Sequence, residues 1–305
     1  MLSDGKEPQL SIIICTHNRA DLLRKTLDSL LHLDDIELVE IIIVDNHSHD
    51  HTEAVIEHYL LQNEDKLAVY SLYESTLGLS AARNAGIQAA SAAIVAFLDD
   101  DAIPAKLWIR TILHTFRQKP EVMAMGGRIA PHFETSRPHW LIKPFELPLT
   151  IVDLGAQIRE YPAKLHPCGA NMALRKSVFE DTLFPLDLGR KGNILLSGEE
   201  SWVFQNLSKA GHVILYHPQM SVEHFIPANR LTREWMTQRY FYQGISNGRA
   251  SKGWLDKLKL VGTLSAKMLY ILLNAMLARS EGSKLLIKCR LESIRGSLTT
   301  LNVRK

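Results

Sequence analysis

The chain has 305 residues, of which 46% are hydrophobic and 22% charged, so it can form one large globular α/β domain or a domain with an extension. Its three cysteines, Cys15, Cys168 and Cys289, are far apart and odd in number. They give neither a disulfide framework nor a metal-ligand spacing, which indicates a reducing compartment. Residues 1–9 are polar and lack the apolar core of a signal peptide, so we expect the protein not to be secreted.

The net charge of +2 conceals two regions of opposite charge. Residues 249–305 carry 12 lysines and arginines against 3 acidic residues, which leaves 23 against 30 for residues 1–248. The body is therefore acidic, with a net charge of −7, and the tail is basic, with a net charge of +9. A basic tail can attract phospholipid headgroups or nucleic acid.

Buried strands and helices alternate along the first third of the chain. Short apolar runs predict strands at residues 10–15, 39–44, 67–72 and 94–98. Apolar residues at helical spacing predict helices at 21–31, 51–61 and 79–90, and Pro104 is expected to start another. This alternation predicts a mainly parallel central sheet with helices on both faces, an α/β fold in which ligands bind beyond the carboxyl ends of the strands.

The rest of the chain is less regular. Residues 131–167 contain six prolines and show no clear period, which predicts a loop-rich insertion over the site. We expect strands at 169–174 and 212–216, helices at 199–210 and 230–249, and a helical extension at 255–301. The predicted domains are therefore a catalytic domain at 1–228 and a basic, amphipathic helical extension at 229–305.

Three consecutive aspartates, Asp99, Asp100 and Asp101, follow the apolar run at 94–98. Three carboxylates at the end of a buried strand repel one another unless a cation neutralises them. Hard oxygen ligands favour Mg²⁺ or Mn²⁺ over zinc, and such an ion often binds the oxygens of a substrate diphosphate. A solvated turn is the alternative for an isolated run of aspartates.

Two common phosphate-binding loops are absent. Residues 15–19, CTHNR, lack the spaced glycines of a dinucleotide fold, and the chain has no lysine-bearing P-loop. This argues against an NAD enzyme and against a P-loop ATPase. His47, His49 and His51 alternate on a predicted loop, but alternation alone does not build a tetrahedral zinc site.

Five motifs, in this order, resemble the family 2 glycosyltransferases, which are nucleotide-sugar enzymes of the GT-A fold. They are residues 11–19 (SIIICTHNR), 44–46 (VDN), 78–86 (GLSAARNAG), 99–101 (DDD) and 197–200 (SGEE). Each motif alone is weak, but the ordered set is specific, and the resemblance covers roughly residues 10–225. It implies a nucleotide-diphospho-sugar donor, a divalent cofactor (Mn²⁺ or Mg²⁺) and inversion at the anomeric carbon.

The resemblance also implies roles for individual residues. Those expected to contact the nucleotide sugar are Thr16, Asn18, Arg19, Asp45, Arg83, Asn84, Asp99, Asp100 and Asn171. The metal would be held by Asp99 and Asp101, with His224 as a further ligand. Glu200 matches the position of the catalytic base, and Glu199 would contact the acceptor or replace Glu200 as the base.

Several of these residues have structural alternatives. Asp45 could cap the following turn, and Glu199 with Glu200 could be the acidic first turn of a helix. Arg83 could be an exposed helix residue, and His224 a structural histidine. The weak acceptor candidates, Trp202 and Trp140, could stack on a sugar or form core contacts, and these alternatives stay open at this point.

The sequence of the basic tail predicts amphipathic helices. Within residues 267–279 the apolar run between charges has only eleven positions, one of them Asn274, whereas a spanning helix needs about 20. We expect an interfacial helix on the cytoplasmic leaflet, and hence a cytoplasmic protein that is peripheral on the membrane. Helices that pack on the body or in a homodimer are the alternative.

The sequence therefore predicts a metal-dependent inverting glycosyltransferase that adds one sugar per encounter to a hydroxyl of a glycan or lipid-linked acceptor, in surface polysaccharide or glycolipid synthesis. One alternative is a sugar nucleotidyltransferase, although the glycine-rich loop typical of that class is absent. Another is a non-catalytic nucleotide-sugar binding protein at a membrane surface. Nucleic-acid binding is not expected, because the tail does not interleave aromatic and basic residues on a recognisable module.

Overall fold

The computed structural model describes residues 7–163, 165–192, 194–251, 253–275 and 277–301. Most of the polar segment at residues 1–9 therefore lies outside the described residues. The chain forms two compact units: residues 1–131, 152–186 and 200–225 make up the first, and residues 132–151, 187–199 and 226–305 the second. The domain boundary at residue 228 stays a prediction.

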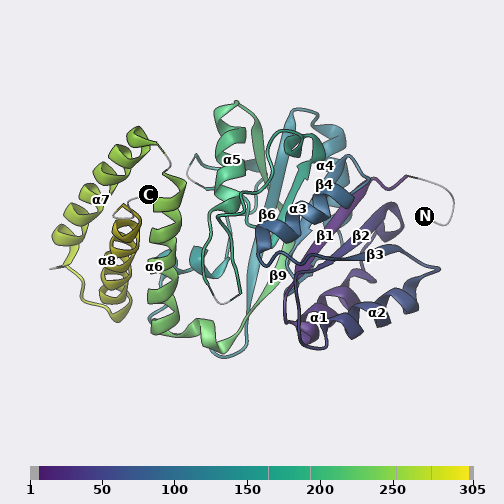
Figure 1. Cartoon of the computed structure of the whole chain (residues 1–305), viewed down its shortest axis with the longest axis horizontal. Coiled ribbons are helices and arrows are strands. Elements are labelled where there is room, and N and C mark those ends of the chain that lie inside the picture. The colour runs from purple at the N-terminus through teal and green to yellow at the C-terminus, as the bar shows by residue number, and fades with distance from the viewer. Residues whose placement is uncertain (1–6, 164, 193, 252, 276, 302–305) are drawn as a thin grey trace. The chain divides into compact units, whose positions relative to one another are not determined.

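A mixed nine-stranded sheet forms the centre of the first unit within the described part of the chain (Figure 1). Its strand order is β3 (Ala68–Tyr73), β2 (Val39–Asp45), β1 (Leu10–Thr16), β4 (Ile94–Leu98), β8 (Asn171–Arg175), β6 (Val122–Phe133), β9 (Val213–Ile226) and β5 (Ala102–Pro104), with β7 (Arg159–Glu160) beside β9. The pairs among the first four strands are parallel, as predicted, whereas β8 pairs antiparallel with both β4 and β6.

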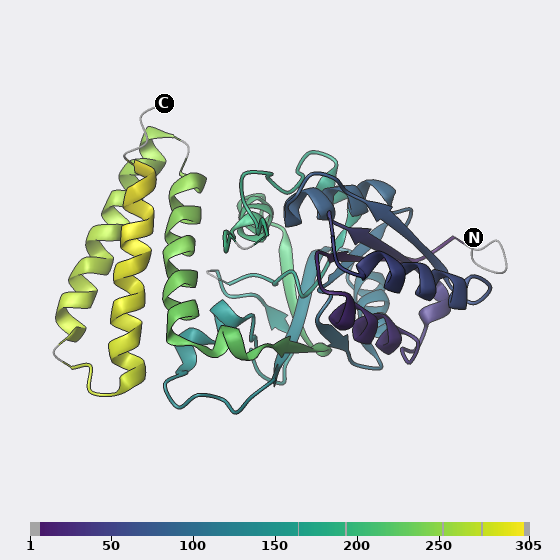
Figure 2. The same ribbon diagram turned by 60° about the horizontal axis from the view of Figure 1, so that its bottom comes forward.

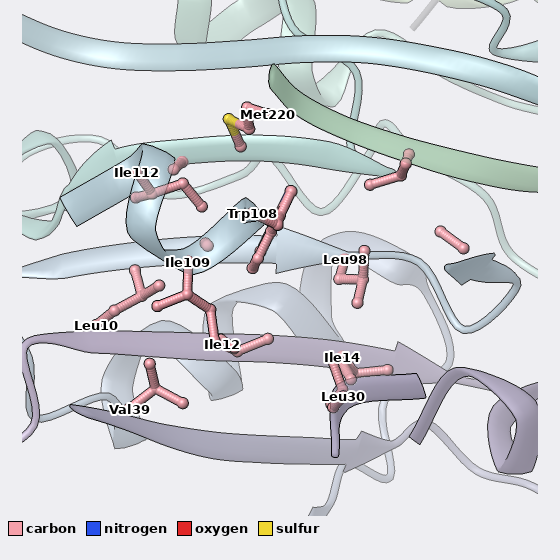
Figure 3. Packing of buried hydrophobic residues seen from close by; sticks show 14 of the residues in the cluster. Leu10, Ile12, Ile14, Leu30, Val39, Leu98, Trp108, Ile109, Ile112 and Met220 are labelled. Atoms are coloured by element: carbon pink, nitrogen blue, oxygen red, sulfur yellow. The ribbon is translucent and has the colours of Figure 1, made fainter. Parts of the chain in front are cut away.

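Helices cover both faces of this sheet, so its central strands β1, β2 and β4 are mostly apolar on both sides. The helices are α1 (Ala20–Leu30), α2 (Thr52–Asn63), α3 (Leu79–Ala89), α4 (Trp108–Gln118) and α5 (Glu199–Lys209). Leu10, Ile12 and Ile14 of β1 pack in one apolar cluster with α1 and α4 (Figure 3), and Ile13 packs in another with residues of α3 and α5. Because side chains alternate along a strand, burial on both faces requires the unbroken apolar run from which the strand was predicted.

Several elements differ from the prediction, among them the short strands β5 and β7, neither of which was predicted. Pro104 ends strand β5 and helix α4 begins at Trp108, so the predicted helix start at Pro104 is wrong. Strand β6 was not predicted, and β9 continues well beyond residue 216. A Cβ at Gly127 of β6 would lie 1.6 Å from the carbonyl oxygen of Met220, so a glycine permits the close backbone approach here and also weakens the strand signal in the sequence.

The second unit contains three long helices, α6 (Arg233–Ala250), α7 (Trp254–Ala275) and α8 (Glu281–Leu301), which lie side by side (Figure 2). This is the predicted helical extension. Helices α6 and α8 approach closely because glycines line their contact: a Cβ at Gly244 would lie 2.0 Å from Ser293 O, and one at Gly296 would lie 2.1 Å from Phe241 O.

Candidate active site

Polar side chains gather at the carboxyl edge of the parallel strands. Strand order reverses between β1 and β4, and open α/β sheets bind their ligands at such a point, beyond the carboxyl ends of the strands. Thr16 and Asp45, the last residues of β1 and β2, are register partners. The Thr16 hydroxyl donates a 2.8 Å hydrogen bond to Asp100 Oδ2, so the end of β1 directly contacts the run of aspartates after β4.

Arg19 binds two of the three aspartates. Its guanidinium donates to Asp101 Oδ2 at 2.7 Å and also to Asp100 Oδ1. Burial raises the pKa of Asp100 to about 6, although the neighbouring Arg19 charge opposes that rise. The resemblance implied a nucleotide contact for Arg19, whereas the structure shows a contact with the acidic run; the nucleotide contact stays a prediction.

Asp99, Asp101 and His224 form a candidate metal site. One possible ligand atom from each lies within 4.8 Å of the others. His224 reaches the aspartates because β9 pairs with β5, where His224 is the register partner of Ala102. Burial raises the pKa of Asp99, and repulsion from Asp101 adds to the rise, while Arg83 and His224 oppose it.

The chemistry of these three side chains fits a divalent cation. The Nδ1 atom of His224 is buried and has no hydrogen-bond partner among the residues that the structure describes. Its Nε2 atom lies 3.3 Å from Asp101 Oδ1. Two carboxylates with an imidazole suit Mn²⁺ or Mg²⁺ in a partly oxygen-ligated site.

A buried arginine connects this group to the predicted base. Arg83, on α3, donates a 3.1 Å hydrogen bond to Glu200 Oε1, and its Nη2 lies 3.9 Å from Asp99 Oδ1. The guanidinium lies 5.9 Å from the ring centroid of Phe97 and 5.4 Å from that of Phe184. Arg83 is therefore not the exposed helix residue that its sequence context allowed.

Gly169 makes room for this contact. The resemblance implied that residues 169–171 lie beside the donor sugar, but of these only Asn171 was predicted to be a site residue. A Cβ at this position would lie 1.8 Å from Arg83 Nη2 and 2.8 Å from Glu200 Oε1. In the sequence, Gly169 is a small residue at the start of the strand predicted at 169–174. Any side chain at residue 169 must displace Arg83 or Glu200.

Asn18 joins the loops that follow β1 and β2, and Asp45 caps the turn after β2. Asn18 has a φ of 53°, and its side-chain oxygen accepts a 2.7 Å hydrogen bond from the His49 amide. Asp45 Oδ1 accepts a 3.1 Å hydrogen bond from the Ser48 amide, which is the turn-capping contact named above as its alternative. Their predicted nucleotide contacts stay predictions.

Asn46 holds the segment that leads into α3. It was not among the predicted site residues. Its amide nitrogen donates to the carbonyl oxygens of Glu74 and Thr76, at 3.0 and 2.8 Å, and its oxygen accepts from the Gly78 amide at 2.8 Å. Gly78 immediately precedes the helix that carries Arg83. An asparagine after a strand was visible in the sequence, but its partners were not.

Two other predicted donor contacts, Asn84 and Asn171, use their amides within the protein. Asn84 exchanges two hydrogen bonds with the backbone of Phe184. Asn171 is fully buried, accepts from the Trp108 indole at 2.8 Å and donates to the Met220 carbonyl at 2.7 Å. These contacts favour structural roles, and the donor-sugar contacts stay predictions.

The acceptor candidates lie in apolar surroundings. Trp140 is buried in the apolar cluster of the second unit, and Trp202 packs against a core cluster of the first. Core contacts are thus the alternative that the structure favours for both. Glu199 is buried and belongs to the second unit.

The alternating histidines do not form a metal group among the described residues, where the aspartate–histidine group is the one found. His47 instead makes a 2.8 Å hydrogen bond with the Tyr73 hydroxyl. The structure therefore gives no support to a zinc site at His47, His49 and His51.

The chain is similar to known proteins both in sequence and in fold. The chain is 24% identical over 243 residues to "Glucosyl-dolichyl phosphate glucuronosyltransferase" of Haloferax volcanii, covering 78% of this chain and 76% of that protein. It is 26% identical over 243 residues to "Succinoglycan biosynthesis protein ExoM" of Rhizobium meliloti, covering 79% and 74%. Its fold is similar to that of the mannosyltransferase PcManGT from Pyrobaculum calidifontis in complex with GDP-Man and Mn²⁺, with a TM-score of 0.64, 16% identity and coverage of 99% and 89%.

The chain also matches a known sequence family. Residues 11–183, more than half of the chain, match the family described as "Glycosyl transferase family 2". This range contains the first four motifs, including the three aspartates. The α/β, GT-A-type fold with added C-terminal helices is likewise shared with solved glycosyltransferases. The chain therefore belongs to glycosyl transferase family 2 and is a glycosyltransferase.

Proposed function

We propose that the protein is a metal-dependent, inverting glycosyltransferase that moves a sugar from a nucleotide diphosphate to a hydroxyl group of a lipid-linked or polysaccharide acceptor. The observation that carries this proposal is the group of Asp99, Asp101 and His224, joined through Arg83 to Glu200. The relatives' names include a dolichyl phosphate glycoside and a polysaccharide, and the similar solved structure holds GDP-Man and Mn²⁺.

Asp99, Asp101 and His224 would hold Mn²⁺ or Mg²⁺. When bound there, the cation would neutralise charge on the leaving diphosphate. Asp101 is almost fully buried, whereas the Asp99 side chain is 33% exposed, so Asp99 is the more accessible of the two carboxylates. Arg19 holds Asp101 from the opposite carboxylate oxygen and orients it towards His224.

Glu200 would act as the base. Its carboxylate takes the proton of the acceptor hydroxyl as that oxygen forms a bond to the anomeric carbon. The bond from that carbon to the diphosphate oxygen breaks with its electron pair on the diphosphate. Attack on the face opposite the leaving group inverts the configuration. The hydrogen bond from Arg83 to Oε1 fixes the orientation of the Glu200 carboxylate.

Two substitutions test this function. Isothermal titration calorimetry measures the binding of Mn²⁺ and donor, and a panel of donors measures turnover. Donors with different bases and sugars are incubated with Mn²⁺, and slow release of free sugar identifies the donor. Asp101→Asn should weaken Mn²⁺ binding at least 10-fold and abolish sugar release. Glu200→Gln should bind Mn²⁺ and donor as the wild type does and lose turnover.

Asp65→Asn, at an exposed position between α2 and β3, is the matched control. It should change neither Mn²⁺ binding nor sugar release. Undiminished turnover in Asp101→Asn would contradict the metal assignment. Undiminished turnover in Glu200→Gln would move the base to Glu199 or elsewhere. Release of pyrophosphate from a nucleoside triphosphate and a sugar phosphate would instead identify a nucleotidyltransferase.

A further inference from the structure

Helix α7 has two apolar faces, and only one of them is covered. Leu260, Leu264 and Ile271 are buried in a cluster with Ile294 of α8. At about 100° per residue these three positions of α7 fall within a sector of about 40° on the helix surface. This inner face attaches α7 to the rest of the second unit.

The outer face of α7 is apolar and exposed. We define it by Trp254, Leu258, Val261, Leu269 and Leu272, which are 70%, 58%, 47%, 59% and 63% exposed. At the same helical spacing these five positions span about 80° and lie well apart from the inner face. Leu255 and Leu273, 54% and 66% exposed, continue this apolar surface on one side. A continuous apolar patch of this kind marks a site of association.

Charge distinguishes a lipid surface from a second copy of the chain as the occupant. Lys257 and Lys259 are exposed and lie on opposite edges of the outer face by helical spacing, and Arg279 follows just after the helix. Residues 249–305 carry a net charge of +9. Two copies meeting through this face would bring two such charges together, whereas an anionic lipid surface supplies the opposite charge.

We infer that α7 lies in the plane of an anionic bilayer, with its outer face in the acyl region and its lysines among the headgroups. Trp254 at one end of the helix suits the interfacial region. Lysine side chains at the edges can extend to the headgroups while their stems stay on the apolar face.

A spanning orientation fits the structure less well. By length and composition alone, α7 is the one helix of the described residues that could cross a membrane, and 17% of its most apolar window is buried. Its inner face, however, is packed on α8, which exposes Lys284, Lys288 and Arg295. Crossing would either separate the two helices or carry these charges into hydrocarbon.

The test is co-sedimentation of the full chain with vesicles, without metal or nucleotide sugar, so that it does not depend on the proposed chemistry. Vesicles of phosphatidylglycerol with phosphatidylcholine should bind the protein, and phosphatidylcholine alone should bind it at least 10-fold more weakly. High salt should release it. The double variant Leu269→Glu, Leu272→Glu should reduce binding by at least about 100-fold, because it removes two leucines that would enter the acyl region and adds two charges.

The matched control is Leu31→Glu, Leu61→Glu, which changes two exposed leucines of the first unit and should alter binding less than twofold. Binding that is lost equally in both double variants, or absent from all vesicles, would overturn the inference. So would bound protein that resists alkaline carbonate extraction, which indicates a spanning helix. A wild-type dimer that the Leu269, Leu272 variant converts to a monomer, without any vesicle binding, would assign the outer face to self-association.

Discussion

Gly169 provides a direct test of the contact between Arg83 and Glu200. In Gly169→Ala, the new Cβ would lie 1.8 Å from Arg83 Nη2, while ordinary van der Waals contact begins at 3.4 Å. The guanidinium therefore has to move by about 1.6 Å, the difference between these two distances. A shift of this size breaks the 3.1 Å hydrogen bond to Glu200.

Arg83 cannot move freely, because its side chain is only 3% exposed and lies against Phe97 and Phe184. Overpacking of this kind costs about 1–3 kcal/mol of stability. A misplacement of about 1 Å near reacting groups can lower turnover about 100-fold. We therefore expect Gly169→Ala to remain folded, with Tm lowered by a few degrees and kcat lowered by about 100-fold.

The assay is sugar release and transfer with Mn²⁺ and the donor identified by the panel, with kcat and KM measured separately. We expect kcat to fall by a larger factor than KM rises, since the displaced group orients the base. Gly262→Ala is the matched control, because no atom lies within 4 Å of its added Cβ, and its kcat should equal that of the wild type. A folded Gly169→Ala protein with wild-type kcat would refute the idea that Arg83 positions Glu200.

Two further predictions concern stability. Glu40 is buried in β2, and its Oε1 accepts hydrogen bonds from the amide and hydroxyl of Ser91 at 2.6 and 2.8 Å, so Glu40→Ala should lower the free energy of unfolding in urea by about 3 kcal/mol. The exposed Glu57→Ala should change it by less than about 0.5 kcal/mol, and equal effects would contradict the burial argument. Burial raises the pKa of Cys289 from 9.0 to about 11, so above pH 9 the unfolded thiol ionises before the folded one. Between pH 9 and 11 the wild type should therefore lose up to about 1.4 kcal/mol per pH unit relative to Cys289→Ala, and parallel pH profiles would show that the thiol is not responsible.

The sequence by itself determined the parallel half of the fold and the order of the motifs. Residues 10–16, 39–45 and 94–98 are strands because a strand buried on both faces must be apolar throughout, which leaves an unbroken local run. Parallel strands end at one edge, so Thr16 and the run of aspartates could be predicted to meet. The signal at β6 and β9 was weaker, because these strands include glycine, proline and polar residues.

Only the tertiary structure decided which distant side chains meet. His224 reaches Asp101 through the register of β9 on β5, and Arg83 reaches Glu200 across 117 residues because Gly169 leaves space between them. The amides of Asn84 and Asn171 are engaged within the protein by partners that no local pattern reveals. The spacing of apolar residues along the chain indicates which residues are buried. The partner of a polar group, however, depends on strand register and on packing between segments that are far apart in the chain.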